Sequence, residues 1–169
     1  MSSVQSADLI FDLKVPVGHS QIFIFSDEIA EPDDFEVAYE DGIDSGRYVG
    51  AAPGMIDLIT PGTWNEGVPV RVEVWPAEPD SDTERWQHEV DVDLDVPDGK
   101  LVLMPGGDSS EFAQEIPAGA YRARVSGAGF TELADEGSYG DDYYRIRLWP
   151  RAAAAEPELR RCWAGWNVE

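Results

Sequence analysis

Apolar and polar residues alternate over most of this 169-residue chain. A repeat of two residues places successive side chains on opposite faces of a strand, whereas a helix repeats about every 3.6 residues. The alternating segments are bounded by clusters of Pro, Gly, Asp and Ser, which commonly separate antiparallel strands. The pattern therefore predicts strands at residues 7–15, 20–25, 55–60, 68–75, 89–96, 100–104, 120–126 and 143–149.

Short strands in this number are typical of a β-sandwich or a closed barrel, and the chain is long enough for one sizeable core. We expect an all-β fold: an antiparallel β-sandwich of about eight or nine strands, with residues 1–169 forming a single domain. The segment 27–44 is expected to be a long acidic loop, or a loop with a helical turn at residues 35–39.

The end of the chain carries the clearest helical signal. Pro157 suits the first position of a helix, where a missing backbone N–H costs nothing. Four apolar residues then follow at spacings that share one helical face, namely Leu159, Cys162, Trp163 and Trp166. We therefore expect a short C-terminal helix in the tail 151–169, with its tryptophans packed on the sandwich.

Acidic residues are clustered along the chain. With 34 acidic and 12 basic residues, the formal net charge is −22. Residues 27–44 hold nine acids and no base, residues 78–98 hold nine acids with Arg85 as the one base, and residues 132–142 hold five acids. Within the strand predicted at 89–96, every second residue up to Asp95 is a carboxylate, so these acids share one face.

Two interpretations of this acidic face remain open. It can be a solvated outer face, neutralised where arginines alternate on neighbouring strands, either at Arg122 and Arg124 or at Arg145 and Arg147. It can instead form a surface that resembles a nucleic-acid backbone and attracts a basic cleft. The candidate partner-binding residues are Asp33, Asp34, Glu36, Glu40, Asp41, Glu89, Asp91, Asp93 and Asp95.

The charge balance also limits the classes of partner. Direct binding to nucleic acid or to an anionic membrane requires Lys and Arg, which are scarce here, so we expect neither. The sequence shows no signal segment and no apolar run of about 18 residues, which favours a cytoplasmic protein. Cys162 is the one cysteine and excludes an internal disulfide framework and a multi-cysteine zinc site.

Signals of catalysis and metal binding are poor. His19 and His88 lie in or beside predicted strands, without a nucleophile or metal motif around them. The acids that begin at Asp80 fail the calcium-loop pattern, because Arg85 stands where Gly is required and Asp91 where a bidentate Glu is required. We predict no catalytic residue, no metal and no cofactor. An alternative function is a carbohydrate- or small-ligand-binding module that uses exposed tryptophans, although packing in the core or an interface is the usual role of such residues.

Four segments resemble the competence protein J family, whose members are described as DNA-entry nuclease inhibitors. The segments are HSQIFIFSD (19–27), WQHEVDVDLDV (86–96), IPAGAYRARVSG (116–127) and DDYYRIRLWP (141–150). The matching positions look structural, so the resemblance carries over no catalytic residue; they are His19, Gln21, Pro117, Gly119, Tyr121 and Tyr144. The family pattern lacks the acidic segment 27–44 and the tail after Pro150.

The resemblance implies a non-enzymatic β-sandwich that binds and silences a nuclease. Together with the clustered acids, it leads to the hypothesis of an acidic inhibitor or immunity-type protein. Such a protein would cover the basic cleft of a nuclease or a toxin.

Overall fold

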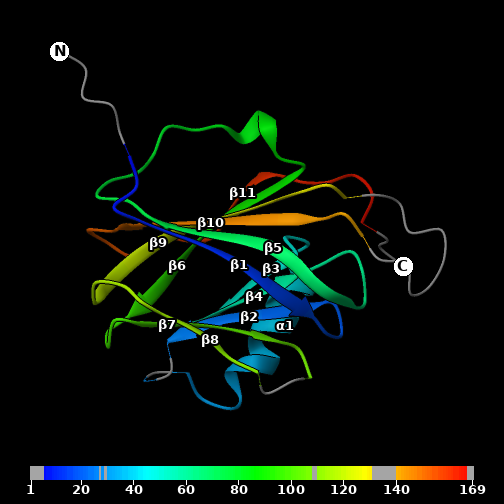
Figure 1. The fold of residues 1–169 in the computed structure, drawn as a ribbon, viewed down its shortest axis with the longest axis horizontal. Coiled ribbons are helices and arrows are strands. Elements are labelled where there is room, and N and C mark those ends of the chain that lie inside the picture. The colour runs from blue at the N-terminus through cyan, green and yellow to red at the C-terminus, as the bar shows by residue number, and fades with distance from the viewer. Residues whose placement is uncertain (1–5, 27, 29, 108–109, 131–139, 167–169) are drawn as a thin grey trace.

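The computed structural model describes residues 6–26, 28, 30–107, 110–130 and 140–166. These residues form two mostly antiparallel sheets, of six and five strands, and one α-helix (Figure 1). The six-stranded sheet has the order β1 (Leu9–Val17), β5 (Asn65–Val74), β10 (Tyr143–Pro150), β9 (Gly119–Ala128), β6 (His88–Val96) and β11 (Glu158–Arg161). The five-stranded sheet has the order β3 (Val49–Ala52), β4 (Met55–Ile59), β2 (Gln21–Ser26), β7 (Lys100–Pro105) and β8 (Phe112–Glu115).

One apolar cluster joins the facing sides of the two sheets. Val90 and Val92 of β6 and Ile22 and Ile24 of β2 are all fully buried in it. In β6 these valines alternate with carboxylates, so the repeat of two that predicted the strand also separates its core side from its outer side.

The helix α1 (Asp34–Asp44) covers the outer face of the five-stranded sheet at β3 and β4. The helix α1 and the strand β3 approach closely because Gly50 of β3 has no side chain. A Cβ atom at this position would lie 1.6 Å from the carbonyl oxygen of Ala38 in α1. Phe35 packs its ring edge against Phe23 of β2, with ring centroids 4.7 Å apart. The structure therefore has a helix of about three turns in the segment where the sequence predicted either a loop or a loop with one helical turn.

The predicted C-terminal helix is wrong for the described residues. Residues 158–161 instead form β11, which pairs antiparallel with β6. Without β11, the acidic strand β6 would be an open edge of the sheet. The strand count also differs, because the described residues contain three four-residue strands that the alternation did not mark, namely β3, β8 and β11. No helix among the described residues has the length and the apolar character to cross a membrane.

Asp57 of β4 is a charged residue in an apolar place. Its side chain is fully buried, and neither oxygen of its carboxyl group has a hydrogen-bond partner among the described residues. Its strand neighbours are Phe23 and Gly50, on the side that α1 covers. Burial without a compensating partner raises the pKa of Asp57 to about 8. The folded protein therefore holds this carboxyl group protonated at neutral pH.

This burial has a consequence for stability as a function of pH. Between pH about 4 and about 8 the unfolded chain has lost the Asp57 proton while the folded chain still holds it, so the free energy of unfolding falls as the pH rises. The variant Asp57→Asn removes this loss. In urea denaturation at pH about 8, we expect the free energy of unfolding of the variant to exceed that of the wild type by on the order of 2–4 kcal/mol. At pH about 5 the difference should be much smaller. An equal difference at both pH values would contradict the assignment.

Candidate partner-binding surface

The carboxylates of β6 lie on the outer face of the six-stranded sheet, where arginines of neighbouring strands neutralise them. β9 runs antiparallel beside β6, and its register places Arg124 opposite Asp91 and Arg122 opposite Asp93. Arg124 donates two hydrogen bonds to Asp91, at 2.9 and 3.0 Å. Arg122 donates one to Asp93 at 2.8 Å. Of the two interpretations of the acidic face, cross-strand neutralisation is the one that the structure contains.

Two of the four carboxylates are enclosed. Glu89 is fully buried and Asp91 is 3% exposed. The Glu89 carboxylate accepts hydrogen bonds from the hydroxyl groups of Ser126 and Thr83, both at 2.6 Å. It also accepts one from Arg160 Nε at 3.1 Å. The expectation of an exposed and unneutralised acidic column is therefore wrong at Glu89 and Asp91.

Asp93 and Asp95 are more accessible, with side chains 21% and 49% exposed. Both lie beside Arg151, which follows β10 directly. The Arg151 guanidinium is 3.4 Å from the Asp93 carboxylate and 2.6 Å from that of Asp95. All four acids of β6 are thus ion-paired.

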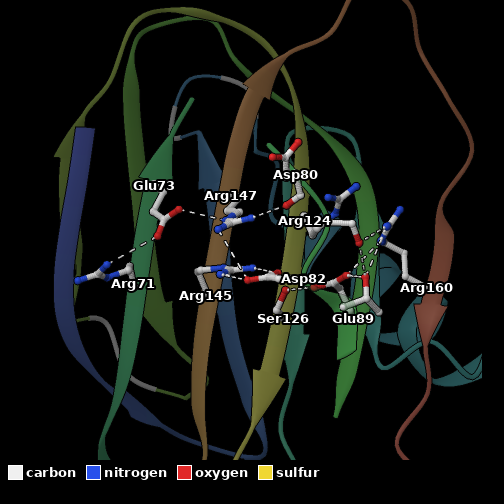
Figure 2. Close-up of polar contacts among 12 residues, drawn as sticks. Arg71, Glu73, Asp80, Asp82, Glu89, Arg124, Ser126, Arg145, Arg147 and Arg160 are labelled. Carbon is white, nitrogen blue, oxygen red and sulfur yellow. Dashed lines mark hydrogen bonds and ion pairs between the residues drawn. The ribbon is translucent and has the colours of Figure 1, made fainter. Parts of the chain in front are cut away.

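The charged layer continues across β10 and β5 (Figure 2). Arg145 donates hydrogen bonds to Asp82 at 2.8 and 2.5 Å, and Arg147 donates one from Nε to Glu73 at 3.1 Å. Asp82 belongs to the connection 75–87, which passes over this face of the sheet (Figure 1). The outer face is therefore a covered ionic layer and not an open acidic surface.

Three of the six tryptophans lie against guanidinium groups of this layer. The distances from arginine Cζ to ring centroid are 5.0, 4.7 and 5.0 Å for Arg124 over Trp149, Arg145 over Trp86 and Arg147 over Trp75. Cation–π contacts of this kind occupy a face of each indole ring. Those faces cannot also stack on a sugar.

The remaining predicted acids belong to α1 and the residue before it. Asp33, Glu36 and Glu40 are exposed. Asp34 is half-buried and accepts a hydrogen bond from the backbone N–H of Glu31 at 2.9 Å. These four acids therefore lie on the opposite side of the molecule from the β6 acids, since α1 covers the five-stranded sheet (Figure 1).

Asp41 serves the fold as well as the surface. It forms an ion pair with Arg47 and accepts a hydrogen bond from the backbone N–H of Ala51 at 2.9 Å. Because Ala51 belongs to β3, this contact fastens the C-terminal half of α1 to the sheet.

The exposed side of α1 also carries apolar residues. Val37 is 48% exposed, and Tyr39 and Ile43 are each 39% exposed. Tyr39 and Ile43 are four residues apart and lie on one edge of the helix, next to the line of Glu36 and Glu40. Sequence reasoning missed Ile43, although its spacing of four residues from Tyr39 was an available signal.

His88 holds the C-terminal segment against β6. Its Nδ1 atom accepts hydrogen bonds from the backbone N–H of Trp163 at 3.1 Å and from the indole N–H of Trp166 at 3.3 Å. The opposite nitrogen donates to the backbone carbonyl oxygen of Arg47. Burial lowers the pKa of His88, and the hydrogen bond to Arg47 opposes this only in part. A neutral imidazole satisfies all three contacts, so the residue is a structural acceptor.

Aromatic rings surround this histidine. The rings of Tyr48 and Trp166 stack with centroids 4.0 Å apart and planes 6° apart. Trp163 meets Trp166 and Phe130 edge to face, at 5.4 and 5.1 Å. Trp163 and Trp166 pack against the apolar core from the non-helical segment that follows β11.

Two of the surface grooves formed by the described residues adjoin the features described above. One, of about 200 Å³, lies between α1 and the C-terminal segment and is lined by Ser20, Tyr39, Ile43, Tyr48, Ile59, Thr60, Pro61, Trp163, Gly165 and Trp166. The other, of about 570 Å³, lies on the outer face of the six-stranded sheet, between Trp86 and the Asp12–Arg71 pair. The charged residues of that second groove largely pair with one another.

Chemical groups suited to catalysis are not gathered in either groove. Both nitrogens of His88 are engaged, and His19 is exposed at a turn with φ 53°. Within the described ranges, no three His, Cys, Asp or Glu side chains are placed to hold a metal ion. Asp82, considered above for calcium, is paired with Arg145.

No protein-family model matches the sequence, and no curated protein matches it. Among solved structures, the chain superposes on ComJ of Bacillus subtilis, inhibitor of the DNA degrading activity of NucA, with a TM-score of 0.55 and 12% identity. The match covers 88% of this chain and 100% of ComJ.

The fold resembles that of ComJ. A second solved structure, described as crocagin biosynthetic gene J, has a TM-score of 0.55 and 16% identity, over 84% of this chain and 97% of its own. At these identities the likeness concerns the fold. It confirms at that level the resemblance to the competence protein J family that the four sequence segments indicate.

The Asp91–Arg124 pair is open to a direct test. Replacing Arg124 by Met leaves Asp91 buried beside Arg160 alone, at 3.5 Å, and we expect a loss of about 3–5 kcal/mol in the free energy of unfolding. The double variant Asp91→Leu/Arg124→Met should recover most of this loss, because no unpaired buried charge remains. As the control, Arg71→Met breaks an exposed pair and should cost little in the same urea titration. Equal losses in both single variants would contradict the buried layer.

The His88 contacts predict a pH effect on the C-terminal segment. Because the folded pKa lies below the ordinary value of about 6.5, the unfolded chain binds the proton first, and stability is lost as the pH falls below that value. The variant His88→Phe removes the acceptor of two N–H groups, and we expect a cost of about 1–3 kcal/mol. Acid-induced change in tryptophan fluorescence between pH about 7 and about 5 should be present in the wild type and absent in this variant. His19 remains in both proteins and serves as the internal control.

Proposed function

We propose that the protein is a non-enzymatic, acidic binding protein of the cytoplasm that inhibits a nuclease or a toxin by covering its basic cleft. The proposed scaffold is a β-sandwich in a single domain. The observation that carries the proposal is the likeness in fold to ComJ over the whole of the ComJ chain, because ComJ is an inhibitor of a DNA-degrading enzyme.

The acids that remain exposed support this function and indicate the side that binds. Glu36 and Glu40 lie on the helix α1, which contains no Lys or Arg, and Asp33 directly precedes it. A basic cleft would be drawn to such a surface, with fast association that salt weakens. We assign the partner contact to these three acids, with Asp34 and Asp41 at their border.

Glu89 and Asp91 receive a structural role in this proposal. Both are buried beneath the connection 75–87 and paired with arginines, so a partner cannot reach them without moving that connection. Asp93 and Asp95 are accessible, but Arg151 already neutralises part of their charge. The carbohydrate-binding alternative is less well supported, since Trp64 is the one tryptophan with an exposure as high as 47%.

Inhibition can be measured directly. A nuclease or toxin encoded beside this gene, or a basic protein retained on the immobilised chain at low salt, is the enzyme to use. We expect the protein to stop DNA degradation at close to one molar equivalent, and high salt to weaken this effect.

Charge-reversal variants then locate the surface. The double variant Glu36→Lys/Glu40→Lys should weaken inhibition at least tenfold, whereas Glu84→Lys, on the opposite side of the molecule, should leave it unchanged. A retained partner whose activity is not affected by the protein would refute the inhibitory function. Equal effects of the two variants would refute the assignment to α1.

A further inference from the structure

We propose that the groove between α1 and the C-terminal segment binds one apolar side chain from a basic segment of a protein partner. Its walls are uncharged and largely aromatic or aliphatic, with Tyr39 and Ile43 on one side and Trp163 and Trp166 on the other. The identity of the partner rests on the function proposed above, but the chemistry of recognition does not.

The size of the groove selects the occupant. Its volume is about 200 Å³. Pockets for small molecules and cofactors usually measure about 300–1,000 Å³. A single aromatic or branched aliphatic side chain suits the smaller space, as the anchors of protein interfaces commonly do.

The groove is built before any partner arrives. His88 accepts hydrogen bonds from Trp163 and Trp166, and Tyr48 stacks on Trp166 with planes 6° apart. Ring positions held in this way need little ordering on binding, which favours affinity. The other wall is the edge of a helix whose Asp41 is bonded to β3.

Charge at the rim determines which segment is attracted. Glu36, Glu40 and Asp44 follow one another at intervals of four residues, so they form a line beside Tyr39 and Ile43. All three are exposed, and Arg47, which follows the helix, is occupied by Asp41. An apolar anchor flanked by Lys or Arg would complement both the walls and the rim.

Two of these acids, Glu40 and Asp44, weaken the helix that carries them, whereas Glu36 lies in its first turn, where the helix dipole favours an acid. Like charges four residues apart repel each other, and Asp44 lies at the negative end of the helix dipole. Folding of the isolated chain therefore does not account for Glu40 and Asp44, and exposure of Tyr39 and Ile43 has no stabilising effect either. Both features suit a surface that is covered in a complex.

The test uses three five-residue peptides as probes and the full chain labelled with ¹⁵N. The first peptide is Lys-Lys-Trp-Lys-Lys, the second has Ser in place of Trp, and the third has Glu in place of each Lys. We expect the first to shift the indole N–H signals of Trp163 and Trp166 saturably. It should bind about tenfold or more tightly than the Ser peptide, and the Glu peptide should not bind.

Two variants distinguish the contribution of the apolar walls of the groove from that of its acidic rim. Ile43→Gln should lower the affinity for the Trp peptide several-fold with no change in its salt dependence. Glu40→Lys should lower the affinity and flatten the salt dependence, and should raise the thermal midpoint because it relieves repulsion from Glu36 and Asp44. Glu84→Lys is the matched control and should bind like the wild type.

The outcomes distinguish this proposal from the inhibitory function. Equal affinity for the Trp and Ser peptides, or no shift at either indole, would overturn the groove as an anchor site. Inhibition of a nuclease that survives Ile43→Gln but not Glu36→Lys/Glu40→Lys would also overturn it and leave the inhibitory function standing. Peptide binding at the groove, in a protein that inhibits no retained nuclease, would support the groove and refute the function.

Discussion

The ion pair between Asp91 and Arg124 is the contact on which the arrangement of the six-stranded sheet depends. β6 alone carries four carboxylates on one face, and β9 and β10 alone carry two arginines each on theirs. None of these strands can bury that face by itself, because an enclosed and unpaired charge costs several kcal/mol. When β6 and β9 lie side by side in the observed register, the arginines of β9 donate hydrogen bonds to the carboxylates of β6. A slip of one residue would direct the arginines into the apolar core.

The neutralised face then allows other segments to cover it. The connection 75–87 is held over the sheet by the ion pair between Asp82 and Arg145. In the same way, the ion pair between Arg160 and Glu89 holds β11 beside β6. Each covering segment excludes water and so strengthens the pairs beneath it. The part of the sheet formed by β10, β9 and β6 is thus covered on both sides, by apolar residues on one and by an ionic layer on the other. The alternation of acidic and apolar residues in β6 determines both sides.

Much of this could be predicted from sequence, and the failures share a cause. Strands with a clear repeat of two, such as β6 and β10, lie within one residue of the predicted bounds. The pairing of Arg122 and Arg124 with the acids was one of two alternatives, and only the strand order could decide it. That order places β9 between β6 and β10, which no local pattern shows. The segment after Pro157 forms the strand β11 and not the expected helix. In this extended segment, Arg160 forms an ion pair with the buried carboxylate of Glu89.

The strand order also changes which acids form the candidate partner-binding surface, from those of β6 to those of α1. Once arginines account for the charge on β6, the predicted acids that remain exposed are Asp33, Glu36 and Glu40, and the helix α1 has no basic residue of its own. There the neighbours of the acids are Tyr39 and Ile43, and the tail tryptophans that His88 orients complete the groove. Acids that stabilise a fold become buried and paired, as in β6. Glu40 and Asp44 of α1 remain exposed and destabilise their own helix, so attraction of a basic partner explains them better than a role in folding.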